Sequence, residues 1–162
     1  ADNVDAAANL YLGRELLTRW GTLDDAAMEA ETRQVMGRLN PNFQRFKDPV
    51  KQLSGGQRQC VAISRSASFA SKLIIMDEPT AALGVEETTQ VENIIRGLKE
   101  QGVPLILISH NLRQVFDLVD KIWVFRRGRI VGEVIASETD GNEIISMITG
   151  MQGGVHEKDS YI

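Results

Sequence analysis

The sequence predicts an α/β protein in which an N-terminal helical part precedes a parallel sheet. Apolar residues recur at helical spacing through residues 1–72, whereas short β-rich runs alternate with helical segments over residues 73–150. A strand, a helix and a further strand of these lengths also require a crossover connection, which places the two strands in parallel. We therefore expect two structural parts, followed by a flexible tail over residues 151–162.

Three helices are expected in residues 1–72. A first amphipathic helix is predicted to end at Gly21, with its apolar positions at Leu10, Leu12, Leu16, Leu17 and Trp20. Thr22 is expected to cap a second helix, which Asn40–Pro41 stops. The third helix opens at Ser54. The apolar faces of the first two helices are typical of a packed helical core rather than of a cofactor site.

The elements of residues 73–150 are expected in a regular order. They are a strand over 73–76, a helix through 91–98, a strand over 103–108, a helix through 112–119, a hairpin of strands 121–125 and 130–135, and a short helix through 144–148 that Gly150 closes. The first two strands are the predicted parallel pair. Their carboxyl ends should therefore meet at one edge of the sheet.

Composition excludes several classes of function. The formal net charge of -4 and the pI near 5.2 provide no positive field for nucleic acid, so we expect no nucleic-acid partner. The single cysteine, Cys60, cannot form an intramolecular disulfide, which favours a reducing cytosolic compartment. Apolar runs such as residues 105–108 are too short to cross a bilayer, so any membrane association is expected to be peripheral, through a partner.

An anion site is the functional interpretation of Leu53-Ser54-Gly55-Gly56-Gln57, which opens the third helix. Ser54 and Gln57 can form a capping box. Capping alone does not explain two adjacent glycines, because glycine lowers helix propensity and costs backbone entropy. The glycines leave backbone N–H groups accessible at the positive end of the helix dipole, where a phosphate can approach.

Two acids follow the predicted strand over residues 73–76. Asp77 and Glu78 should emerge at its carboxyl end, which is the edge where open α/β sheets bind ligands. In phosphoryl transfer the first acid of such a pair commonly holds Mg²⁺ and the second orients or deprotonates a water molecule. Acids also end strands without any chemical role, so this signal is moderate by itself.

His110 follows the next strand, at the same predicted edge of the sheet. A lone histidine is more often structural than catalytic. The position of His110 beside the strand that carries Asp77 and Glu78 favours a functional role, in which the imidazole donates a hydrogen bond to a γ-phosphate oxygen.

The segments LSGGQRQ, LIIMDEPTAALG and LILISHNL, in this order and spacing, resemble the signature motif, Walker B motif and switch histidine of ABC ATPases. The resemblance spans nearly the whole chain and implies a partial P-loop (RecA-like) ATPase core with a helical subdomain. Residues 9–15, NLYLGRE, resemble the monosaccharide-importer branch, as do residues 82–84 and Asn111. We call residues 53–57 the signature segment.

The resemblance implies roles for individual residues. Ser54, Gly55, Gly56 and Gln57 would contact the γ-phosphate of an ATP held mainly by a second ATPase subunit. Asp77 would hold Mg²⁺ through water, Glu78 would be the catalytic carboxylate and His110 the γ-phosphate switch. The implied partners are that second subunit, transmembrane permease subunits and, indirectly, an extracytoplasmic solute-binding protein. The implied location is the cytoplasmic face of a bacterial inner membrane.

Two departures from the family pattern stand out. Gly84 replaces an aspartate that many relatives carry after Walker B, which removes a side-chain contact between subunits. The sequence also holds no Gly-Lys dipeptide, and so no Walker A loop to hold the phosphates. We therefore expect a fragment that is inactive alone. In ATPases of this family the strand that leads to Walker A lies between the strands that correspond to residues 103–108 and 121–125. Without it the edges of those strands would be unpaired, so we also expect the chain to self-associate.

Two other classes of function stay open on the sequence. A non-catalytic interaction module would keep the fold and bind no nucleotide, which a binding measurement would reveal. A DNA-repair or chromosome-organising ATPase would share the signature and Walker B motifs. That class needs a long coiled-coil insertion and usually a basic DNA-facing surface, and the sequence shows neither.

Overall fold

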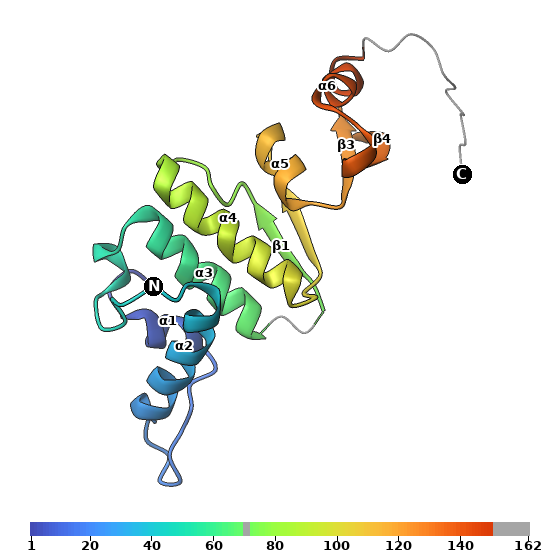
Figure 1. Cartoon of the computed structure of the whole chain (residues 1–162). Helices are drawn as coiled ribbons and strands as arrows, with labels where there is room; N and C mark the ends of the chain where they lie inside the picture. The colour runs from blue at the N-terminus through green and yellow to red at the C-terminus, as the bar shows by residue number, and fades with distance from the viewer. Residues whose placement is uncertain (70–71, 151–162) are drawn as a thin grey trace. The chain divides into compact units, whose positions relative to one another are not determined.

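The computed structural model describes residues 1–69 and 72–150 (Figure 1). The chain forms two compact units, of which the first ends at Ser109 and the second begins at His110. The described residues contain two sheets of two strands each.

Three helices make up the N-terminal part of the first unit. They are α1 (Ala6–Tyr11), α2 (Asp25–Leu39) and α3 (Gly55–Phe69), with a short 3₁₀ turn, η1 (Val50–Gln52), before α3. Aspartates cap the first two, because the Asp5 and Asp24 side chains accept N–H bonds from Ala8 and Ala27. The three helices contact one another around a buried core that includes Leu10, Met28, Met36, Cys60 and Ile63.

The predicted first helix through Trp20 is wrong. Helix α1 ends at Tyr11, and Gly13 has a φ of 81°, a left-handed conformation that ends the helix. The chain then folds into a small hairpin in which Leu17 pairs with Leu23. The apolar side chains here face solvent, Trp20 with 77% of its surface exposed, so their helical spacing does not report a buried face. Asp24, not Thr22, caps the next helix.

The parallel pair of strands is confirmed. Strands β1 (Ile74–Asp77) and β2 (Leu105–Ile108) pair in parallel, with Ile74 opposite Leu105 and Asp77 opposite Ile108. Helix α4 (Val85–Glu100) connects them and packs beside α3 (Figure 1). Burial alternates along β1, because Ile74 and Met76 are buried whereas Ile75 is 63% exposed. One face of this sheet therefore presents apolar side chains to solvent.

The second unit is built on the predicted hairpin. Helix α5 (Leu112–Leu118) precedes the antiparallel strands β3 (Lys121–Arg126) and β4 (Arg129–Ile135), and η2 (Ala136–Glu138) and α6 (Gly141–Thr149) follow. Arg127 and Gly128 both have positive φ, which is the conformation of a tight hairpin turn. The core of this unit is formed by Val115, Ile122, Val124 and Ile144.

The fold class predicted from the sequence is confirmed, since helices precede a parallel sheet joined by a crossover helix. The predicted division after residue 72 rests on a change of sequence pattern and stays a prediction. The predicted flexible tail, residues 151–162, lies outside the described residues.

Candidate functional site

The signature segment opens helix α3 as a reciprocal capping box. The Ser54 N–H donates to Gln57 Oε1 at 3.0 Å, and the Gln57 N–H donates to Ser54 Oγ at 3.4 Å. Leu53 anchors the segment, because its side chain is only 3% exposed. Ser54 itself is exposed, so the hydroxyl lies at the surface at the positive end of α3.

The two glycines of the signature segment lie against the start of helix α4. A Cβ at Gly55 would come within 2.7 Å of Leu83 Cδ2, and one at Gly56 within 2.9 Å of Glu87 Cβ. The Cβ at Gly56 would also lie 3.2 Å from the Glu87 Cα, so the obstacle includes backbone. Close packing between two helix starts therefore requires these glycines, a reason that sequence reasoning missed. Access for an anion stays a separate prediction.

Glu87 is the acidic group at this contact. Its carboxylate accepts the Gly84 N–H at 3.3 Å, which caps α4. The Ser54 hydroxyl, and then the backbone N–H groups of Gly56, Gly84 and Gly55, lower the pKa of Glu87. The carboxylate thus lies among donors from the starts of two helices. Sequence reasoning missed this residue, although a glutamate three positions after a helix N-cap is a recognised capping signal.

The two predicted acids lie where β1 ends, as expected. Asp77 is the last residue of β1 and is exposed, and the next N–H, that of Glu78, donates to Ile108 O at 2.9 Å. Glu78 has a φ of 45°, which costs a non-glycine residue about 1–2 kcal/mol. Such strain recurs at functional sites, where the surrounding structure holds it in place.

The loop of residues 79–84 connects these acids to the signature segment. It begins after Glu78, and near its end Leu83 lies against Gly55 and the Gly84 N–H donates to the Glu87 carboxylate. Ala82 in this loop also has a positive φ, 61°. One short loop therefore joins the acids at the end of β1 to the Ser54 and glycine donors at the start of α3.

The carboxylates at the end of β1 fit a magnesium ion that phosphate oxygens also hold. Asp77 and Glu78 supply hard oxygen donors, and Mg²⁺ in nucleotide sites is usually bound by one or two carboxylates plus substrate phosphates. Over residues 1–69 and 72–150, no group of three or more His, Cys, Asp or Glu side chains is placed to hold a metal by itself. The donor set suits a shared ion rather than a closed protein site.

Comparison with known proteins finds similarity to one family. Residues 3–81 match the ABC transporter family. The fructose import ATP-binding protein FrcA of Rhizobium meliloti is 40% identical over 151 residues, which covers 89% of this chain and 58% of FrcA. The chain is thus similar to the ATP-binding proteins of ABC transporters over most of its length. It spans little more than half the length of FrcA.

Two further comparisons agree with this family. Ribose import ATP-binding protein RbsA 2 of Burkholderia ambifaria is 39% identical over 148 residues, which covers 91% of this chain and 29% of RbsA 2. A metal-chelate type ABC transporter in an inward-facing conformation shares the fold, with a TM-score of 0.73 at 22% identity over 90% of this chain and 58% of that chain. The chain therefore has the fold of an ABC ATPase.

His110, the predicted γ-phosphate switch, belongs to the second unit. It is exposed and precedes Asn111, whose side chain accepts the Gln114 N–H at 3.3 Å and caps α5. Ile108, two residues earlier, is paired with Asp77 at the edge of the parallel sheet. The strand ends thus meet as predicted, whereas the role of His110 stays a prediction.

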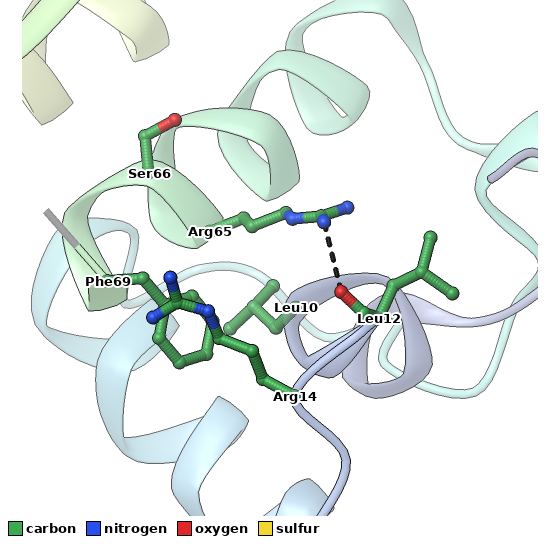
Figure 2. Close-up of a pocket in the computed structure, with 6 residues that line it drawn as sticks. All are labelled: Leu10, Leu12, Arg14, Arg65, Ser66 and Phe69. Carbon is green, nitrogen blue, oxygen red and sulfur yellow. Dashed lines mark hydrogen bonds between the residues drawn. The ribbon is translucent and has the colours of Figure 1, made fainter.

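A pocket lies on the helical part of the first unit (Figure 2). It is lined by Leu10, Leu12, Arg14, Arg65, Ser66 and Phe69. The Arg14 guanidinium lies 4.7 Å from the centroid of the Phe69 ring, and Arg65 donates to Leu12 O at 3.1 Å. The pocket therefore combines an apolar floor with two cationic groups.

Across the described residues, no helix has the length and apolar character needed to span a bilayer.

Proposed function

We propose that this chain is part of the ATP-binding subunit of an ABC importer that couples ATP hydrolysis to uptake of a small solute, of the sugar class. The observation that supports it is the ordered set of signature segment and strand-end acids on one compact unit, in a chain whose relatives are named fructose and ribose import ATP-binding proteins. The solute class follows from those names.

In this proposal the signature segment binds the γ-phosphate of an ATP held mainly by a second ATPase subunit. Ser54 donates its hydroxyl, Gly55 and Gly56 donate backbone N–H groups, and Gln57 donates its side-chain amide. The exposed position of Ser54 at the start of α3, where the helix dipole favours an anion, supports this role. Donors that are fixed in place before the phosphate arrives need little reorganisation.

The strand-end residues act on the same phosphate. Asp77 would hold Mg²⁺ through water, and Glu78 would orient the attacking water and take its proton as general base. Bound Mg²⁺ would neutralise charge on the phosphate oxygens. His110 donates a hydrogen bond to a γ-phosphate oxygen, which distinguishes ATP from ADP. The Glu78 N–H donates to the Ile108 carbonyl at the end of β2, which supports the role of Glu78 because this hydrogen bond fixes the backbone that carries the base.

The decisive test is Glu78→Gln in the complete subunit. Loss of a general base should lower hydrolysis about 10²–10⁴-fold. ATP-dependent dimerisation should persist, because the substitution also removes a negative charge near the γ-phosphate. Size-exclusion chromatography in ATP and in ADP measures the second effect. A variant that dimerises no better in ATP than in ADP would contradict the role of Glu78.

This chain by itself is expected to show no ATPase activity, since its sequence holds no Walker A lysine to work with Asp77 and Glu78. Phosphate release from ATP by the purified chain measures this. The control is the Glu78→Gln form of the same preparation. Turnover that disappears in that control would show that the chain hydrolyses ATP after all.

We propose as partners a second ATPase subunit, transmembrane permease subunits and, through them, a solute-binding protein, at the cytoplasmic face of a bacterial inner membrane. The helical part, residues 1–72, is the proposed docking surface for the permease. Its hairpin exposes Leu17, Trp20 and Leu23, each more than half exposed. In the intact transporter, a crosslinker on Trp20→Cys should capture the permease. Crosslinks confined to Arg129→Cys, on the hairpin of the second unit, would contradict this surface.

A further inference from the structure

The Glu87 carboxylate lies beside the donors that are proposed for the γ-phosphate. Glu87 lies on the first turn of α4, and the nearby Ser54 hydroxyl and the N–H groups of Gly56 and Gly55 lower the pKa of its carboxylate. The absence of a side chain at Gly55 leaves room for this carboxylate, because Glu87 Oε2 would lie only 3.3 Å from a Cβ at Gly55. The protein thus places an anion of its own at the start of α3.

Two anions cannot lie side by side at these donors without repelling each other. A phosphate that accepts the Ser54 hydroxyl and the glycine N–H groups must therefore displace the nearby Glu87 carboxylate. Glu87 keeps a second partner when displaced, because the Gly84 N–H also donates to it at 3.3 Å. The carboxylate can therefore leave α3 while it stays capped on α4.

We propose that Glu87 is a positioning residue whose carboxylate lies beside the phosphate-binding donors of the signature segment until the γ-phosphate of ATP displaces it. This proposal rests on the proposed function of Ser54, Gly55 and Gly56. Displacement moves the carboxylate away from the start of α3, beside the 79–84 loop that follows Glu78. A ligand shifts such an equilibrium only through its different affinity for the two states. ADP lacks the competing phosphate and leaves Glu87 in place.

The test uses the complete subunit in the Glu78→Gln background, where hydrolysis does not consume the ATP. Glu87→Gln removes the charge and keeps the side-chain shape. Glu86→Gln is the matched control, since it makes the same charge change on the same turn at an exposed residue outside the contact. We expect Glu87→Gln to reach half-dimerisation at an ATP concentration on the order of threefold lower than the control. In ADP the two variants should behave alike.

The outcomes separate the two proposals. A parent protein that does not dimerise in ATP overturns the proposed function itself. A parent that dimerises, with Glu87→Gln requiring as much ATP as the control or more, overturns the displacement of Glu87.

If the Glu87→Gln variant fails to fold, a measurement on the protein that keeps Glu87 tests the same proposal. The ¹³C shift of the Glu87 carboxyl carbon in the complete Glu78→Gln protein should change on addition of ATP and stay constant on addition of ADP. Equal responses to the two nucleotides would also overturn the displacement.

Discussion

Gly56 lies so close to Glu87 that a methyl group at residue 56 would approach the Glu87 Cβ to 2.9 Å. Helices α3 and α4 meet at this point with a glycine on one side and an acidic side chain on the other. The contact involves the first turn of each helix, where backbone N–H groups have no partner within the helix. Both packing and charge therefore depend on the same pair of residues.

Gly56→Ala is expected to destabilise the protein by about 1–3 kcal/mol, because the added methyl group overpacks a contact that includes the Glu87 backbone. Urea unfolding measures the change. Gly37→Ala is the control, since Gly37 lies in α2 with open space around its Cβ position, and alanine there should stabilise by about 0.5–1 kcal/mol. Equal effects of the two substitutions would contradict the close contact.

The stabilising contribution of Glu87 should disappear in acid. Its pKa is lowered in the folded state, so the charged carboxylate stabilises the fold at neutral pH and this contribution is lost as the pH falls through the folded pKa, below 4.5. The difference in unfolding free energy between the native protein and Glu87→Gln should be constant from neutral pH to about pH 5 and shrink below it. A difference that does not shrink in acid would contradict this contribution of Glu87.

Tyr11 should titrate with a pKa of about 12. Burial of Tyr11 is the largest cause of this increase, and the hydrogen bond to Glu31 and the negative charge of Glu31 raise the pKa further. Because the pKa is raised in the folded state, neutral Tyr11 stabilises the fold up to its ordinary pKa of 10.0, and this stabilisation is lost as the pH rises toward 12. In Tyr161→Phe, Tyr11 is the remaining tyrosine, and its absorbance change isolates the titration. A midpoint near 10 would contradict the burial.

The chain alone should self-associate through the sheet of β1 and β2. In the described residues β2 has one neighbouring strand, β1, and the sheet exposes Ile75, Ile106 and Ile108, with Ile75 63% exposed. Exposed apolar surface on a strand edge favours pairing with another copy. Light scattering should show a species larger than the monomer, and Ile75→Lys should reduce it. A strict monomer for the unmodified chain would contradict this expectation.

Much of the fold could be predicted from local pattern. The run before Asp77 and the run before Ser109 are apolar and β-rich, and they pair as a parallel sheet. The helix predicted through Trp20 failed because periodicity reports spacing and not burial, and Gly13 turns the chain first. The acids were placed at the strand end because sheet topology determines where such residues emerge.

The contact between the glycines and Glu87 was beyond sequence reasoning. It joins residues more than thirty positions apart, and no local pattern reports which helix start packs against which. A capping signal at Glu87 was visible, but the Ser54 and glycine groups that also lower its pKa come from α3, and only the packing of α3 against α4 brings them close. The left-handed backbone at Glu78 was equally invisible, since the sequence places no glycine there.

The burial of Cys60 makes the protein convenient for site-directed labelling. This cysteine is the only one in the sequence, it has no exposed surface, and burial raises the pKa of its thiol. Reagents that attack thiolates at neutral pH should therefore leave it unmodified while the chain is folded. A spin label or fluorophore can then be attached to one introduced surface cysteine without first removing the native one. Reaction at Cys60 would in turn report unfolding of the helical part.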